Sequence, residues 1–107
     1  MTTINLEDED LFVAVFGAGA DSYPWYSRFR YDEEALEASV AINCEGIAAE
    51  VDPIGPSHLR WAIRDMVAKG ASLGTIDFSD PECDSDFDAE LADCIIQWVL
   101  LREVVFG

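Results

Sequence analysis

Basic residues are scarce in this chain. Six lysines and arginines stand against 22 aspartates and glutamates, which gives a net charge of −16 over 107 residues. A field of this sign repels nucleic acid and anionic membranes and attracts basic surfaces. We therefore expect no direct nucleic-acid binding and no membrane partner, and any protein partner should be basic.

Motifs for catalysis or metal binding are missing as well. The three cysteines, Cys44, Cys83 and Cys94, form no close C-x2-4-C pair, and His58 is the single histidine. This spacing argues against a zinc site, and no glycine-rich phosphate loop, nucleophile elbow or H-E-x-x-H motif occurs. We predict a non-enzymatic protein with no catalytic residues, no metal and no cofactor. The odd number of unpaired thiols predicts a reduced, intracellular environment.

No apolar run is long enough to cross a membrane. The longest one, near the end of the sequence, is interrupted by Gln97 and Arg102 and falls short of the ~20 residues that a span needs. Near the start, the acidic residues 7–10 stand where a signal peptide would have a basic and then an apolar region. We expect a soluble, cytoplasmic protein.

Apolar residues are nevertheless plentiful, at 50% of the chain. A chain of this length predicts a single domain, residues 1–107, that can bury a core without disulfides. In chain order, the apolar periodicity predicts a helix at 6–16 capped by Asn5, strands at 25–31, 37–43 and 47–52, and helices at 56–69 and 87–107. A short strand at 75–78 is a further option. The order α-β-β-β-α-α predicts an α+β fold, with a three-stranded antiparallel sheet packed against helices.

The last stretch, 87–107, is apolar on most of its circumference. Its polar residues Asp86, Glu90, Asp93 and Gln97 follow one another at spacings of 4, 3 and 4, which places them in one strip along a helix. Since the remainder of the helix is apolar, we expect this strip to be the side that faces water.

The densest charge precedes and enters that stretch. Eight carboxylates occur within 17 residues with no basic residue among them, and we predict that they form a partner-binding acidic face: Asp77, Asp80, Glu82, Asp84, Asp86, Asp88, Glu90 and Asp93. Their spacing is about one charge per ~7 Å if the chain is extended and per ~3 Å if it is helical. One strand of duplex DNA carries a charge every ~3.4 Å. Imitation of nucleic-acid charge is one interpretation, and a solvated loop that maintains solubility is the other.

Part of this segment has the D-x-D-x-D pattern of a calcium-binding loop. Ala89 and Ile95, however, stand where that loop needs its glycine and its bidentate glutamate. The sequence therefore does not predict a specific calcium site.

A second group of residues has the opposite charge. Arg60 and Arg64 flank Trp61 on the helix predicted at 56–69, and Trp61 lies off its apolar stripe. One interpretation is pairing of these arginines with the acidic face of the same chain. The other is a second contact patch for self-association as a homodimer, with Trp61 as the anchor.

Three motifs of the chain resemble those of a known group of proteins. They are the run Tyr23-Pro24-Trp25-Tyr26, the acidic loop at 86–88, and the ending Glu103-Val104-Val105-Phe106-Gly107. In this combination they are similar to small acidic orphan proteins of actinobacterial phages, which pair a PW motif with a GEVVYG-like C-terminus. Here Arg102 replaces the glycine of that ending and Phe106 its tyrosine. The resemblance implies a phage context and specifies no activity.

Charge and resemblance together suggest a phage-type interaction protein. It would bind and inhibit a basic, nucleic-acid-binding protein in the cytoplasm of the host cell, as a nucleic-acid mimic or an anti-defence protein. The alternative is a small structural, assembly or homo-oligomeric phage protein without an inhibitory role. Adaptation to high salt would explain the acidity without any partner.

Overall fold

The computed structural model describes residues 2–71, 73 and 76–107. Its elements follow the order α-β-β-β-α-α, with two short 3-10 turns inserted, and the predicted α+β fold is confirmed. The elements are α1 (Asp8–Phe16), η1 (Ala20–Ser22), β1 (Tyr26–Asp32), β2 (Glu37–Cys44), β3 (Ile47–Ile54), α2 (Pro56–Ala68), η2 (Cys83–Asp86) and α3 (Ala89–Leu101).

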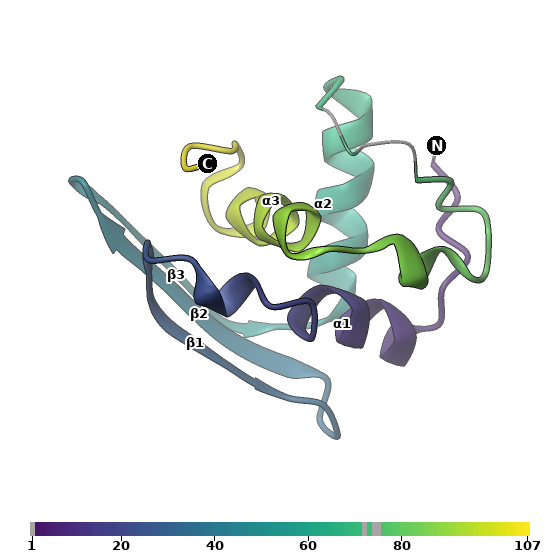
Figure 1. Ribbon diagram of the computed structural model, residues 1–107, viewed down its shortest axis with the longest axis horizontal. Coiled ribbons are helices and arrows are strands. Elements are labelled where there is room, and N and C mark those ends of the chain that lie inside the picture. The colour runs from purple at the N-terminus through teal and green to yellow at the C-terminus, as the bar shows by residue number, and fades with distance from the viewer. Residues whose placement is uncertain (1, 72, 74–75) are drawn as a thin grey trace.

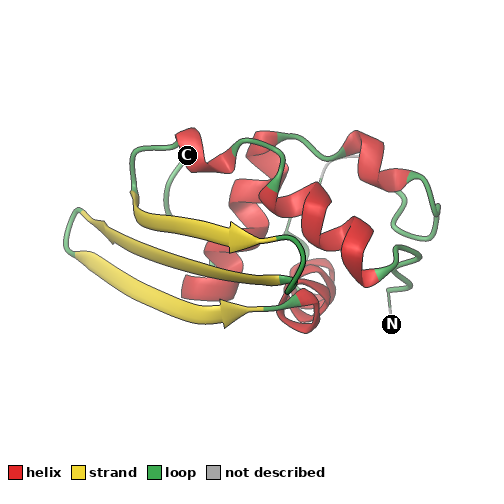
Figure 2. Cartoon of the chain, turned by 90° about the horizontal axis from the view of Figure 1, so that it is seen from below, coloured by secondary structure: helices red, strands yellow, loops and turns green. Residues whose placement is uncertain are grey.

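The three strands form one antiparallel sheet in the order β1-β2-β3. A two-residue turn joins β2 to β3, and its residues Glu45 and Gly46 both have positive φ, as a tight hairpin that follows the twist of its strands requires. All three helices lie on one side of the sheet, and they also pack against one another (Figures 1 and 2).

The core lies between the sheet and the helices. Each helix contributes the apolar face that its periodicity predicts, and the sheet contributes the inward residues of its strands. Fully buried members include Leu11, Phe12, Val15, Phe16, Val40, Ile54, Leu59, Ala62, Ile63, Met66, Ile95 and Ile96. In the described residues, no helix is both long and apolar enough to cross a bilayer.

The predicted boundaries of α1 and β3 are wrong. Helix α1 begins at Asp8, and Glu7 rather than Asn5 is its N-cap residue, without a side-chain capping bond. Strand β3 continues through Pro53 to Ile54, because it is an edge strand and the missing N–H of proline removes no ladder bond there. The option of a strand at 75–78 falls partly outside the described residues, and Phe78 lies in a turn.

The last helix is also shorter than predicted. It ends at Leu101, where Arg102 adopts a left-handed conformation (φ +59°) and turns the chain back along the helix. Residues 103–107 are therefore a tail that lies beside α3 rather than its last turn. The apolar residues Val104 and Val105, which would continue the helical pattern, are about two-fifths exposed.

Candidate functional site

Most of the predicted acidic face is a surface loop held at three points. Phe78 and Cys83 are buried, and half-buried Phe87 packs edge-to-face on Phe78 with 6.0 Å between ring centroids. Between these anchors the carboxylates point outward. Asp77, Asp80, Glu82, Asp86, Asp88 and Glu90 are exposed, and Asp84 is half-buried.

Several of these carboxylates also order the loop. Oδ1 of Asp77 accepts hydrogen bonds from the Ser79 backbone N–H (3.0 Å) and hydroxyl, and Oδ1 of Asp80 accepts from the Glu82 N–H at 2.9 Å. The side-chain and backbone bonds from Ser79 lower the pKa of Asp77. Asp88 caps α3, because its Oδ1 accepts from the Leu91 N–H at 2.8 Å. The acidic loop thus has a defined conformation rather than only a high charge.

A second set of carboxylates lies beside this loop. The Asn5 backbone N–H donates to the Phe78 carbonyl oxygen at 2.7 Å, and the Asn5 amide donates to the Ser79 carbonyl oxygen at 2.9 Å. Helix α1 packs against η2, and the N-terminal segment and the acidic loop lie on the same side of the molecule in Figures 1 and 2. Residues 7–10, all acidic and exposed, therefore extend the surface. We call residues 7–10 and the carboxylates of 77–90 the acidic edge.

Basic side chains neutralise little of the acidic edge. The ion pairs within the described residues are Arg28–Glu50, Arg60–Asp8 and Lys69–Asp65. Only Asp8 of the acidic edge takes part in one of them. Within the described residues, the carboxylates of the loop consequently face solvent without a basic partner.

Asp93 is the exception, and its prediction as part of a solvent-facing strip is wrong. Its side chain is 3% exposed, and its oxygens accept hydrogen bonds from Trp25 Nε1 (2.9 Å), the Tyr26 hydroxyl and Gln97 Nε2 (2.9 Å). Gln97, from the same predicted strip, is fully buried. Asp86 and Glu90 of the strip are exposed as predicted, whereas Asp93 and Gln97 face residues 25–26 and the C-terminal tail, which supply polar partners in place of water.

Gln97 connects that cluster to the C-terminal tail. Its Oε1 accepts from the N–H groups of Val105 (2.9 Å) and Phe106 (3.0 Å), while its Nε2 also donates to the Phe106 carbonyl oxygen at 2.9 Å. The Phe106 ring stacks on Trp25, which stacks on Tyr23, with centroid distances of 5.5 and 4.7 Å. The aromatic run at 23–26 and the chain ending, which both carry the phage resemblance, therefore meet in one structural cluster.

Burial has a clear electrostatic effect in this cluster. It raises the pKa of Tyr26 far above the usual value for tyrosine, and the hydrogen bond to Asp93 raises it further. The Tyr26 hydroxyl is thus held in its protonated, donating form. The arrangement satisfies a buried carboxylate, and we assign it a structural role.

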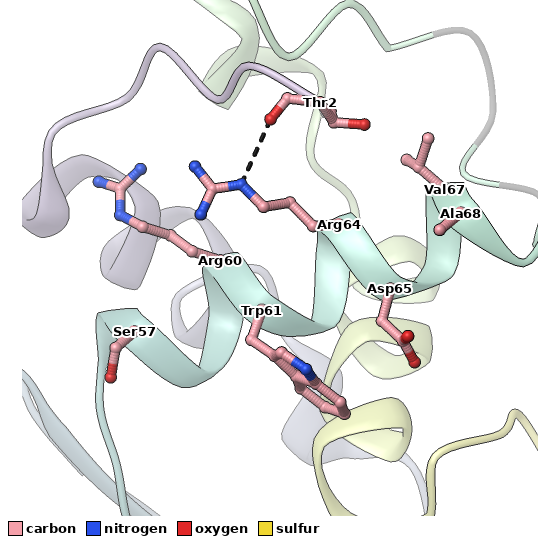
Figure 3. A pocket seen from close by; sticks show the side chains of 8 residues that line it. All are labelled: Thr2, Ser57, Arg60, Trp61, Arg64, Asp65, Val67 and Ala68. Atoms are coloured by element: carbon pink, nitrogen blue, oxygen red, sulfur yellow. Dashed lines mark hydrogen bonds between the residues drawn. The ribbon is translucent and has the colours of Figure 1, made fainter.

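The three residues of the predicted basic patch differ in their surroundings. Arg60 is used inside the molecule, because it donates to Asp8 and to the carbonyl oxygens of Ile4 and Leu6. Arg60 thus pairs within the chain, but its partner Asp8 belongs to α1 and not to the predicted acidic face. Trp61 is 41% exposed, and Arg64 makes one hydrogen bond, from Nε to the Thr2 carbonyl oxygen at 3.3 Å (Figure 3).

The histidine and two of the cysteines show no sign of a catalytic role. His58 Nδ1 accepts a hydrogen bond from the Gly55 N–H at 3.0 Å and so caps the start of α2. Burial raises the pKa of the Cys83 and Cys94 thiols, which leaves them less reactive. Within residues 2–71, 73 and 76–107, no three histidine, cysteine, aspartate or glutamate side chains are placed to hold a metal ion.

Comparison with known proteins found no matching family model, no similar curated protein and no similar solved structure. The resemblance to phage proteins therefore stays a prediction.

Proposed function

We propose that this protein is a non-enzymatic inhibitor that binds a basic surface of another protein through its acidic edge. The single observation that carries the proposal is the ordered, solvent-facing set of loop carboxylates that has no ion-pair partner within the described chain. Such a surface attracts a basic protein at long range and offers it carboxylates on contact. The ordering of the loop by Asp77, Asp80 and Asp88 reduces the conformational entropy lost on binding.

The partner that we propose is a nucleic-acid-binding protein of a phage's host, met in the host cytoplasm. Such proteins carry basic surfaces shaped for phosphate backbones, so a dense row of carboxylates can occupy the same surface. In this proposal the acidic edge is a nucleic-acid mimic, and inhibition of a host defence protein is one use of it. The phage context rests on the resemblance of the motifs at 23–26 and 103–107.

The geometry of the acidic edge favours binding over acid–base chemistry. A general acid or base at neutral pH needs a carboxyl whose pKa is raised toward 7. Ser79 instead lowers the pKa of Asp77, and six of the loop carboxylates are exposed to solvent.

A pair of matched variants tests the proposal. The edge variant combines Asp80→Asn, Glu82→Gln, Asp86→Asn and Glu90→Gln, which are exposed and do not cap α3. The control variant combines Glu33→Gln, Glu34→Gln, Glu37→Gln and Glu45→Gln at the ends of the sheet, which are also exposed. Each variant changes the net charge from −16 to −12.

Both variants and the parent protein would be used to capture proteins from host lysate, and the captured proteins would be tested for displacement by DNA or RNA. We expect the parent and the control to retain a nucleic-acid-binding protein that the edge variant loses. If the two variants lose capture to the same extent, net charge and not the acidic edge is responsible for binding. Capture that neither DNA nor RNA displaces would leave binding intact and refute the mimicry.

An assembly or homo-oligomeric role remains the second proposal, since Trp61 is a large aromatic residue exposed on α2. Light scattering after size exclusion tests it. A dimer lost in Trp61→Ala and kept in the edge variant would favour this role, and a monomer at all concentrations would refute it.

A further inference from the structure

A groove of about 960 Å³ runs along the outer face of α2 (Figure 3). It is lined by Thr2 of the N-terminal segment and by Ser57, Arg60, Trp61, Arg64, Asp65, Val67 and Ala68 of the helix. At ~1.5 Å per residue, the stretch from Ser57 to Ala68 spans about 16 Å of helix axis. The groove is thus long enough for roughly three turns of a second helix.

The groove exposes two large apolar side chains. Trp61 is 41% and Val67 is 42% exposed, because the core contacts of α2 are made by its opposite face. The Arg102 guanidinium lies 5.1 Å from the centre of the Trp61 ring and covers part of it. An ordered, partly exposed tryptophan flanked by arginines has the composition of a binding hot spot.

The groove has more basic than acidic side chains, in contrast to the whole protein. Its carboxylate, Asp65, pairs with Lys69, and its Arg60 pairs with Asp8. Arg64 donates through its Nε to the Thr2 carbonyl oxygen, its one hydrogen bond within the described residues. In the described part of the chain, neither Arg64 nor Arg102 has a carboxylate partner. Arg64 in the groove, and Arg102 where it lies over the Trp61 ring, can therefore donate hydrogen bonds to a carboxylate of an incoming segment.

We infer that this groove docks an acidic amphipathic helix of a partner protein, at a second site that adjoins the acidic edge at the Arg60–Asp8 pair. Apolar side chains at helical spacing would pack on Trp61 and Val67, and a carboxylate on the same helix would pair with Arg64. At physiological salt, charges more than about 8 Å away are largely screened. The local arginines, rather than the total charge of −16, then determine which segment is accepted. A second copy of this chain is disfavoured, because a symmetric contact through α2 would bring the same arginines of both copies together.

Fluorescence anisotropy with a model peptide tests this site at about 0.15 M salt. The probe is a labelled peptide of about 15 residues in which leucine recurs at helical spacing and glutamate fills the other positions. We expect saturable binding that Trp61→Ala weakens at least tenfold, about the loss expected of an interface anchor. Arg64→Gln should weaken it severalfold, and Arg30→Gln, at an exposed arginine of β1, should leave it unchanged.

The same peptide with lysine in place of glutamate is the charge control. It should bind the acidic edge, with no dependence on Trp61. The inference is overturned if the glutamate peptide does not bind or binds Trp61→Ala as well as the parent protein. It is also overturned if the parent protein self-associates through Trp61, since a second copy would then occupy the groove. Circular dichroism checks that each variant is folded. If Trp61→Ala does not fold, the effect of Arg64→Gln on peptide binding decides whether the inference holds.

Discussion

Gln97 and Phe106 are joined by two hydrogen bonds between one side chain and one backbone. The Phe106 N–H donates to Gln97 Oε1 at 3.0 Å, and Gln97 Nε2 donates to the Phe106 carbonyl oxygen at 2.9 Å. The same amide also donates to Asp93, which accepts from Trp25, so two buried side chains together connect α3, the tail and the turn before β1. The tail is consequently part of the folded domain, although it contains no helix or strand.

Replacing Gln97 with methionine should therefore be strongly destabilising. Methionine fills a similar volume but removes the donor to Asp93 Oδ2 and the partners of the Val105 and Phe106 backbone groups, which leaves buried polar groups unsatisfied. We expect the free energy of unfolding to fall by about 2–4 kcal/mol, measured by urea denaturation.

The matched control is Glu103→Gln, an exposed substitution on the same tail. It should change stability by less than about 0.5 kcal/mol. Equal stability of the two variants would show that the bonds between α3 and the tail contribute nothing to the fold.

The raised pKa of Tyr26 leads us to predict that the protein loses stability in alkaline solution. Burial raises its pKa in the folded protein, so above the usual tyrosine pKa of 10.0 the unfolded chain releases a proton that the folded protein keeps. Rising pH then favours unfolding, by up to about 1.4 kcal/mol per pH unit from this residue. Below pH 10 the residue is protonated in both states and adds no slope.

Urea denaturation between pH 8 and 11 would measure this effect. Tyr26→Phe should be less stable than the parent protein at pH 8 by about 1 kcal/mol, through loss of the bond to Asp93, and the difference should shrink above pH 10. Tyr31→Phe, at a tyrosine that is 42% exposed, should keep the slope of the parent protein. A slope unchanged by Tyr26→Phe would assign the alkaline transition to other groups.

Periodicity was sufficient to predict the fold, and it failed where distant segments meet. The helical and strand patterns depend on neighbouring residues, so element types and their order could be read directly. The strip containing Asp93 was correctly placed on one side of α3, but its partner Trp25 lies 68 residues away in the sequence. A helical pattern cannot distinguish a polar strip that faces water from one that faces such a partner.

The acidic edge shows the same limit. The carboxylates of 77–90 were predicted from local density, and the loop anchors at Phe78 and Cys83 keep them exposed as expected. Their junction with residues 7–10 depends on bonds from Asn5 to Ser79, which are 74 positions apart. Asn5 had a local signal, that of an N-cap residue, and its use in a long-range contact carried no sequence signature.

Asp88 allows capping to be separated from charge. Asp88→Ala removes the bond to the Leu91 N–H and should lower the free energy of unfolding by about 1 kcal/mol. Asp88→Asn keeps a good capping side chain and should stay within a few tenths of a kcal/mol of the parent protein.

Thermal unfolding of both variants measures the difference, and partner capture adds a second readout. If the acidic edge acts through charge, Asp88→Asn weakens capture while stability is retained. A stable Asp88→Asn protein with full capture would remove Asp88 from the binding surface.

The salt dependence of unfolding should measure how far the acidic edge destabilises the folded protein. Clustered carboxylates repel one another, and this repulsion is strongest at low ionic strength, where the screening length is about 30 Å at 0.01 M. Neutralising four of them in the edge variant should raise the free energy of unfolding by about 1 kcal/mol at 0.01 M salt, if each removed like-charge pair contributes a few tenths. The gain should vanish near 1 M salt, where the screening length is about 3 Å.

The sheet-end control, with the same net charge of −12, should gain less, because Glu45 lies at the end of the sheet opposite to Glu33, Glu34 and Glu37. Equal gains would show that stability responds to total charge alone, as adaptation to high salt predicts. A larger gain in the edge variant would locate the repulsion at the acidic edge. A destabilising cluster that is nevertheless present and ordered is the expected feature of a surface selected for binding rather than for folding.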